Sequence, residues 1–146
     1  MIGITPVCLL ALTIGFAAGL PHSSEGQDAS LFNGAQSFTG DLTFYNPSVG
    51  ACGLKNTDSD LVVSISKLRF DSQTPGSSPN LNPLCGQKIR AGRIDERTGQ
   101  PATVEAMIVD RCVGYLVNDI DLSPAAYNVL ADLALGRVTV HWDLLG

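Results

Sequence analysis

A carboxyl group close to the start of a predicted helix is the side chain of this sequence best placed for acid–base chemistry. Asp121 stands two residues before Ser123, a typical N-cap, and Pro124 suits the first helical position. The positive end of a helix favours the ionised form of a nearby carboxyl, whereas the close carboxyl of Asp119 opposes it by raising one of the two pKa values. Asp121 is therefore a candidate functional carboxyl group, and the alternative is that it only fixes the start of the helix.

A predicted strand over residues 40–45 carries three polar side chains at alternate positions. Asp41, Thr43 and Tyr45 therefore share one face of this strand. A Tyr offers a flat apolar face to a sugar ring and a hydroxyl to orient it, although Tyr also occurs as a half-buried strand aromatic. Because a glycosidase needs two carboxyl groups across the scissile bond, Asp41 could serve as the second carboxyl.

Composition excludes several other kinds of function. The chain has 146 residues, of which 16% are charged and 45% hydrophobic, so it is too apolar for a disordered protein and too short for two ordinary domains. Nine basic residues in a chain of net charge −5 do not supply the phosphate contacts of a general nucleic-acid binder. The two His and four Cys show none of the usual metal-ligand spacings, so neither a metal nor another cofactor is expected.

The N-terminus has the pattern of a secretory signal peptide. An apolar run over residues 7–18 holds no charged side chain and is followed by small residues that suit cleavage after Gly19. The run breaks at Gly19 and Pro21, which makes it short for a membrane-spanning helix of about 20 apolar residues. We therefore expect a signal peptide over residues 1–19, a flexible polar segment over residues 20–36, and an extracellular protein without membrane contact.

Cleavage at this point would leave an odd number of cysteines. The sequence holds Cys8, Cys52, Cys85 and Cys112, and the expected signal peptide carries the first of them. Disulfides form in the oxidising environment of secreted proteins. Three mature cysteines permit one intramolecular disulfide and leave one thiol that is free or forms an intermolecular bond.

Short β-type runs separated by turn residues must position these side chains. The predicted strands cover residues 40–45, 61–66, 88–94, 102–109 and 137–143. One helix is marked by Ser123 at its start and by Gly136 in a C-cap position. In the last strand, Trp142 shares an apolar face with Val140, which predicts a core position. Five or six strands and one helix favour a small closed β-barrel, because closure removes the sheet edges.

Four short motifs follow one another in an order that indicates a fold family. They are Thr43-Phe44-Tyr45-Asn46-Pro47, Gly50-Ala51-Cys52-Gly53, Val109-Asp110-Arg111-Cys112 and Asp121-Leu122-Ser123-Pro124-Ala125-Ala126-Tyr127. Their order and spacing resemble the double-psi β-barrel of the rare lipoprotein A, expansin and barwin group, above all its small secreted fungal members and similar bacterial papain inhibitors. The resemblance implies a mainly β fold over residues 37–146, a six-stranded double-psi barrel with one or two short helices.

The resemblance also implies a binding groove and a disulfide. The positions that line the polysaccharide groove in this family correspond to Thr43, Tyr45, Asp110 and Asp121. The disulfide of the family corresponds to Cys52 and Cys85.

A second cysteine pair of many fungal relatives is not matched in this sequence. Tyr115 stands where the second cysteine of that pair would be, so Cys112 is expected to be unpaired. A buried thiol there would be inert and the protein monomeric, whereas an exposed thiol could link a dimer.

These features favour a secreted protein that binds a cell-wall polysaccharide without hydrolysing it. In related endoglucanases a second catalytic Asp follows the first-strand motif, and here Asn46 and Pro47 occupy that stretch. The resemblance therefore implies an expansin-like or loosenin-like protein that binds cellulose or chitin. The Asp58-Ser59-Asp60 segment resembles the papain inhibitors and supports a second hypothesis, a secreted inhibitor of a cysteine protease or an effector. A weaker alternative is a glycan-cleaving enzyme with Asp121 as general acid.

Overall fold

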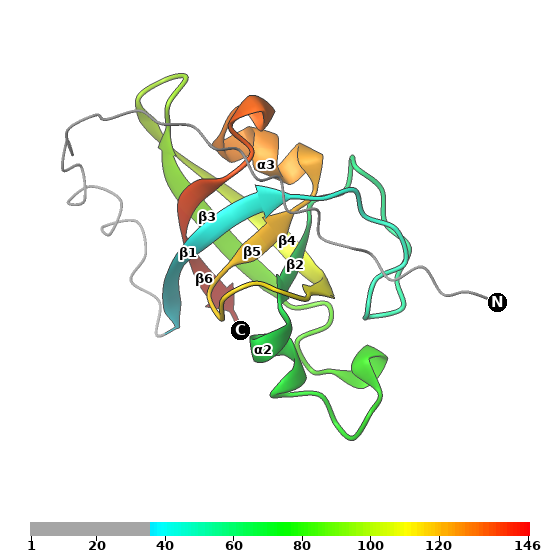
Figure 1. The fold of residues 1–146 in the computed structure, drawn as a ribbon. Coiled ribbons are helices and arrows are strands. Elements are labelled where there is room, and N and C mark those ends of the chain that lie inside the picture. The colour runs from blue at the N-terminus through cyan, green and yellow to red at the C-terminus, as the bar shows by residue number, and fades with distance from the viewer. Residues whose placement is uncertain (1–35) are drawn as a thin grey trace.

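Six strands close into a barrel in the part of the chain that the structure describes (Figure 1). The computed structural model describes residues 36–146, so the expected signal peptide and nearly all of the expected flexible segment lie outside the described residues. The strands are β1 (Ser37–Phe44), β2 (Val62–Ser66), β3 (Lys88–Asp95), β4 (Gln100–Cys112), β5 (Ile120–Leu122) and β6 (Val138–Leu145). The connections contain the helices α2 (Lys67–Asp71) and α3 (Pro124–Leu130) and the 3-10 turns η2 (Pro79–Leu81) and η3 (Leu133–Leu135). The prediction of a mainly β, six-stranded barrel with one or two short helices is confirmed.

Strands that are distant in sequence are neighbours in this barrel. The order around it is β1-β5-β2-β4-β3-β6. β1 runs parallel to β5 and β2 runs parallel to β4, whereas the other neighbours are antiparallel. Because β6 pairs with both β1 and β3, the sheet closes and has no free edge.

Alternation along the strands directs one set of side chains into the barrel. Val140 and Trp142 of β6 are 0% and 1% exposed. The indole Nε1 of Trp142 donates a hydrogen bond to Asn118 O over 2.8 Å, and its ring packs against Phe38 with centroids 4.5 Å apart. The predicted core position of Trp142 is confirmed.

The helix that follows Ser123 is shorter than the sequence predicts. The Ser123 Oγ caps its first turn, as expected, but the helix ends at Leu130 because Ala131 adopts an extended conformation. The Asp132 carboxylate accepts a backbone hydrogen bond over 2.8 Å and starts a separate 3-10 turn, which Gly136 follows. The predicted single helix up to Gly136 is therefore wrong, because an Asp that caps a new turn interrupts it.

The connection between β4 and β5 is fixed against neighbouring elements by side-chain hydrogen bonds. Ser66 Oγ donates to Tyr115 O, and Arg69 Nε donates to another backbone carbonyl of the connection, each over 3.3 Å. Gly40 of β1 lets the connection approach closely, since a Cβ there would lie 2.3 Å from Asn118 O. These contacts place Tyr115 next to β1.

Candidate functional site

Four strands bring hydroxyl and carboxyl side chains into one row on the outer face of the barrel. Thr43 of β1 pairs with Asp121 of β5. On its other side Asp121 pairs with Ser64 of β2, which in turn pairs with Asp110 of β4. Paired residues on neighbouring strands project to the same face, and the residues that flank Thr43, Asp121 and Ser64 in sequence pack in or against the core. We call Thr43, Asp121, Ser64 and Asp110 the polar row.

A β-bulge at Val109 places Asp110 in the polar row. Val63 pairs with Ile108, but the next residue of β2, Ser64, pairs with Asp110, so Val109 is an extra residue of β4. Ile108 faces the core, and strict alternation would direct Asp110 the same way. An extra residue reverses the alternation beyond it, and Asp110 consequently joins the outer face.

Asp121 is a buried carboxyl group with two hydroxyl neighbours. It is 1% exposed, and its Oδ1 accepts a hydrogen bond from Thr43 Oγ1 over 2.7 Å. Burial raises the pKa of Asp121 from 3.8 to about 6, although hydrogen bonds from Thr43 and Tyr115 and the charge of Arg137 act in the opposite direction. The carboxyl group therefore titrates near pH 6, a shift that is common among groups in binding and catalytic sites.

Tyr115 lies over the Thr43 end of the polar row. Its hydroxyl is in hydrogen-bond contact with Thr43 Oγ1, and the guanidinium carbon of Arg137 lies 5.7 Å from the centre of its ring. Arg137 also forms an ion pair of 2.9 Å with Asp41. Burial raises the pKa of the Tyr115 phenol, and the charge of Asp121 raises it further, so this phenol is a neutral hydrogen-bond donor.

Tyr45 carries a hydroxyl near both carboxyl groups of the row. The phenol oxygen is buried and has no hydrogen-bond partner within residues 36–146. Burial raises the pKa of Tyr45, and the charges of Asp110 and Asp121 raise it further, so the phenol stays protonated. A buried hydroxyl without a partner costs roughly 1–3 kcal/mol.

Asp110 is held by two backbone amides. Its Oδ1 accepts hydrogen bonds from Ala51 N over 2.9 Å and from Arg111 N over 2.8 Å. Burial raises the pKa of Asp110, and the two amide hydrogen bonds offset only part of this rise. The Arg111 guanidinium forms its ion pair with Asp71 of α2. Asp110 thus combines a fixed orientation with a tendency to remain protonated at higher pH than an ordinary Asp.

Asp119 has a structural role although it stands only two residues from Asp121. Its Oδ1 accepts a hydrogen bond from Asp41 N over 2.9 Å, and its Oδ2 accepts one from Leu116 N over 3.0 Å. Both oxygens are thus occupied by backbone amides and fix the β4–β5 connection to β1. The Asp41 side chain, which the sequence offered as a substitute for the second carboxyl group of a glycosidase, is paired with Arg137.

One cysteine expectation is confirmed and another stays a prediction. Cys52 and Cys85 form a disulfide, as the family resemblance implies. Cys112 at the end of β4 is buried and is disulfide-bonded in the full chain. The expected unpaired thiol belongs to the mature chain without residues 1–19, so that expectation and the thiol-linked dimer stay predictions.

No group of three or more His, Cys, Asp or Glu side chains in residues 36–146 is arranged to hold a metal ion. No helix among the same residues is long and apolar enough to cross a membrane.

Solved structures of other proteins have the same architecture. No protein-family model matches the sequence. The Streptomyces papain inhibitor matches with a TM-score of 0.65 and 29% identity, over 77% of this chain and 96% of that chain. A mutant expansin of Clavibacter michiganensis in complex with cellohexaose matches with a TM-score of 0.59 and 18% identity, over 76% of this chain and 51% of that chain. Cerato-platanin 2 of M. perniciosa matches with a TM-score of 0.53 and 16% identity, over 75% and 95% of the two chains.

These neighbours share one fold, the expansin-like double-psi β-barrel. The present chain has the double-psi β-barrel fold. A curated relative of this double-psi barrel is an allergen Asp f 7 homolog of Arthroderma benhamiae, which is 33% identical over 85 residues. The match covers 58% of the double-psi barrel chain and 26% of the relative, so the chain spans about a quarter of that relative's length.

The double-psi barrel brings together all the residues that the sequence nominated for a groove, namely Thr43, Tyr45, Asp110 and Asp121. Ser64, Tyr115 and Arg137 were not predicted as members of the site. Ser64 lies in a β-branched run whose pairing was unknown, and Arg137 meets Asp41 only through the β1–β6 register. Tyr115 was noticed only as a replacement for a cysteine, and an aromatic residue in a loop between two site carboxyls is the signal that could have found it.

Proposed function

We propose that this protein binds a neutral cell-wall polysaccharide, cellulose or chitin, at the polar row without hydrolysing it, as an expansin-like or loosenin-like protein. The observation that carries the proposal is the Tyr45 hydroxyl, which is buried near two carboxyl groups and lacks a hydrogen-bond partner within residues 36–146. A sugar hydroxyl both donates and accepts hydrogen bonds. It therefore suits a site in which a phenol lies beside carboxyl oxygens.

The charges of the site favour a neutral polymer over an acidic one. The charge of Asp110 raises the pKa of Asp121, so the two carboxyl groups already oppose each other's ionisation. An anionic ligand would add a further like charge, which costs binding free energy. The expansin that was solved with cellohexaose, a neutral oligosaccharide, supports this choice of ligand.

The interactions of the other carboxyl groups near Asp121 support binding without hydrolysis, since Asp110 is held by two backbone amides. Asn46 lies where related endoglucanases carry their second catalytic Asp, and its Nδ2 donates a hydrogen bond to Asp58 over 2.9 Å. Asp41 is paired with Arg137 and Asp119 with two backbone amides. Asp121 could act as an acid, but a hydrolase of this kind also needs a base that activates water.

Binding of cellohexaose and retention on insoluble cellulose and chitin test this proposal. Tyr45→Phe removes the unpartnered hydroxyl and should weaken cellohexaose binding by about tenfold, the equivalent of one hydrogen bond. Tyr127→Phe is a matched control, because Tyr127 also has a buried hydroxyl without a partner among the described residues but lies in the core. Equal affinities of wild type and Tyr45→Phe, with no retention on either polymer, would contradict polysaccharide binding.

A second candidate function is inhibition of a cysteine protease. The papain inhibitor is matched over 96% of its length at 29% identity, whereas the expansin is matched over 51% at 18%. The β4–β5 connection also exposes aliphatic side chains, with Val113 at 66% and Leu116 at 74% exposure. A loop that is fixed by side-chain hydrogen bonds and exposes apolar groups is suited to a protein partner, because little conformational entropy is lost on binding.

A papain inhibition assay, run beside the polysaccharide measurements, separates the two candidates. If the second function holds, wild type inhibits papain and Leu116→Ser weakens inhibition, because an apolar contact is lost. Leu135→Ser is the control, since Leu135 is 47% exposed and follows α3 rather than the β4–β5 connection. Inhibition that both variants retain would exclude the β4–β5 connection as the inhibitory loop.

We also propose that the protein acts outside the cell after removal of residues 1–19. The Cys52–Cys85 disulfide is consistent with an oxidising compartment. N-terminal sequencing of secreted protein should begin near Leu20, and secreted material that retains residues 1–19 would refute the proposal.

A further inference from the structure

A compact loop over residues 48–56 lies against the Asp110 end of the polar row. Asn56 N donates to Ser48 O over 3.1 Å, and Gly50 N donates to Leu54 O over 3.2 Å, so the two sides of the loop are hydrogen-bonded to each other. Val49 and Lys55 form an isolated β-bridge within it. The loop therefore has a defined shape of its own.

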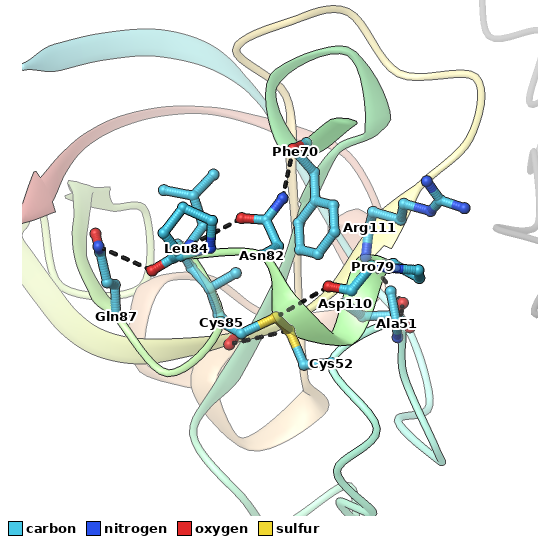
Figure 2. Close-up of a disulfide and its surroundings, with 12 residues drawn as sticks. Ala51, Cys52, Phe70, Pro79, Asn82, Leu84, Cys85, Gln87, Asp110 and Arg111 are labelled. Carbon is cyan, nitrogen blue, oxygen red and sulfur yellow. Dashed lines mark hydrogen bonds between the residues drawn. A yellow bond between two sulfur atoms is a disulfide. The ribbon is translucent and has the colours of Figure 1, made fainter. Parts of the chain in front are cut away.

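Two consecutive amides of this loop bind the bulged segment of β4. Ala51 N donates to Asp110 Oδ1 over 2.9 Å, and Cys52 N donates to Val109 O over 3.1 Å. The loop thus contacts both the extra residue of the bulge and the carboxyl group that the bulge turns outward. Figure 2 shows Ala51, Cys52 and Asp110 side by side.

Gly50 packs directly on the Asp110 side chain. A Cβ at Gly50 would lie 2.9 Å from the Cβ and Cγ of Asp110 and 2.5 Å from Val109 O, both closer than real Cβ contacts. Any larger residue at this position must displace the loop from the carboxyl group. The absence of a side chain at Gly50 is therefore what lets Ala51 N reach Asp110.

The disulfide fixes the other side of the loop to a rigid support. Cys85 is bonded to Cys52, and Gly86 N donates to Ile108 O over 2.9 Å, which ties this segment to β4. Asn82 is 3% exposed, and its side chain donates to Phe70 O over 2.6 Å and accepts from Leu84 N over 2.8 Å (Figure 2). The loop is thus clamped between β4 and a segment that is itself anchored to α2.

We propose that Gly50 and the Cys52–Cys85 disulfide are positioning elements of the binding site, which hold Ala51 N on Asp110 and so fix the carboxyl group that the ligand meets. The proposal rests on the proposed polysaccharide-binding function. It differs from the ordinary role of a disulfide, which stabilises the folded chain by constraining the unfolded one. A merely stabilising disulfide would affect the unfolding free energy and leave Asp110 and ligand affinity unchanged.

A double-mutant cycle with cellohexaose as the probe separates these two roles. Gly50→Ala, which keeps the disulfide, should weaken binding by about tenfold, the equivalent of one charge-assisted hydrogen bond. In an Asp110→Asn background the same substitution should change affinity by less than about twofold, because coupled residues are not additive. The pair Cys52→Ser and Cys85→Ser, where it folds, should follow the same pattern. Equal effects of Gly50→Ala in both backgrounds would overturn the proposal.

Gly99→Ala is the matched control for a general loss of stability. Gly99 has a positive φ of 68° and open space around its Cβ position, so Ala strains the β3–β4 turn without reaching the site. It should lower the urea concentration at which the protein unfolds and leave cellohexaose binding unchanged. A loss of affinity in Gly99→Ala as large as that in Gly50→Ala would show a stability effect alone and overturn the proposal.

A titration without ligand tests the positioning even if cellohexaose does not bind. Burial is the main cause of the raised pKa of Asp110, with Ala51 N, Arg111 N and the Arg111 charge acting against it. Displacement of the loop by Gly50→Ala should remove the Ala51 N hydrogen bond and admit water to the carboxyl group, so the pKa of Asp110, measured by NMR, should differ from that of wild type. An unchanged pKa of Asp110 would overturn the positioning role, whereas absence of cellohexaose binding by wild type would count only against the proposed function.

Discussion

Thr43 Oγ1 donates a hydrogen bond of 2.7 Å to Asp121 Oδ1, although 78 residues separate the two in sequence. The contact follows from the parallel pairing of β1 with the three-residue strand β5, which places the two residues directly opposite each other. Asp121 thus meets its hydrogen-bond donor on the outer face while its neighbours Ile120 and Leu122 remain in the core. A carboxyl group buried in this way destabilises the folded state when it is charged, so the free energy of unfolding depends on pH.

Asp121→Asn should stabilise the protein at neutral pH. The pKa of Asp121 is about 6 in the folded chain and near 3.8 in the unfolded one. Between these values the folded state holds a proton that the unfolded state has released, so the free energy of unfolding falls as pH rises from about 4 to 6. At about 1.4 kcal/mol for each pKa unit the total loss is roughly 3 kcal/mol. Asn carries no charge, so the Asn variant does not lose this stability as the pH rises.

Urea unfolding of wild type and Asp121→Asn at several pH values measures this effect. The two unfolding free energies should differ little near pH 4 and diverge as pH rises to about 6, with the Asn variant more stable. Other carboxyl groups titrate in both proteins and cancel in the difference. A difference that is constant with pH would mean that Asp121 does not have the raised pKa.

Thr43→Val should raise the pKa of Asp121 above its value of about 6. Val has nearly the shape of Thr but no hydroxyl, so the carboxylate loses a hydrogen bond that favours its charged form. An NMR titration of the Asp121 carboxyl carbon measures the change. Thr39→Val is the control, because Thr39 lies on the same strand and its hydroxyl contacts His141 instead. An Asp121 pKa that responds equally to both substitutions would point to a general effect on β1.

Trp142→Phe should lower stability by about 2 kcal/mol without changing cellohexaose affinity. The substitution leaves a smaller ring in the core and removes the indole hydrogen bond to Asn118 O. Binding is measured well below the unfolding temperature of the variant. A selective loss of affinity would instead indicate that Trp142 is a sugar platform.

The protein should not release reducing sugar from cellulose or chitin at enzyme-like rates between pH 5 and pH 7. Asp121 would be partly protonated in this range and able to donate a proton. However, Asn46 stands where related endoglucanases carry their second catalytic Asp, and an Asn side chain cannot act as the base. A reducing-sugar assay with a known cellulase as positive control measures this. Robust turnover that Asp121→Asn abolishes would contradict the non-hydrolytic interpretation and identify Asp121 as a general acid.

The sequence alone predicts the direction of side chains that follow regular alternation along a strand. The core position of Trp142 and the shared outer face of Thr43 and Asp41 follow from a period of two on a single strand. Asp110 is different, because its outward direction depends on the bulge at Val109, and a bulge is a property of the pairing between β2 and β4. Family resemblance placed Asp110 in the site, whereas alternation alone would have placed it in the core.

The sequence also fails to predict the short elements of the fold. β5 has three residues, Ile120–Leu122, which is too few to show a period, yet this strand carries Asp121. The end of α3 was missed for another reason: Ala131 and Asp132 have no strong helix-breaking character, and the competing cap at Asp132 depends on local hydrogen bonding. The strand β5 and the cap at Asp132 both depend on contacts that exist only in the folded chain.

The insertion of β5 between β1 and β2 determines when, during folding, the site comes into existence. A nascent chain that ends before residue 120 contains Thr43, Tyr45 and Asp110 but lacks the strand that connects β1 to β2. Barrels built from such distant pairings fold in milliseconds to seconds, because loop closure must precede the contacts that stabilise it. Ligand binding should therefore return during refolding only when the barrel closes, so the rate at which binding recovers measures the rate of this closure.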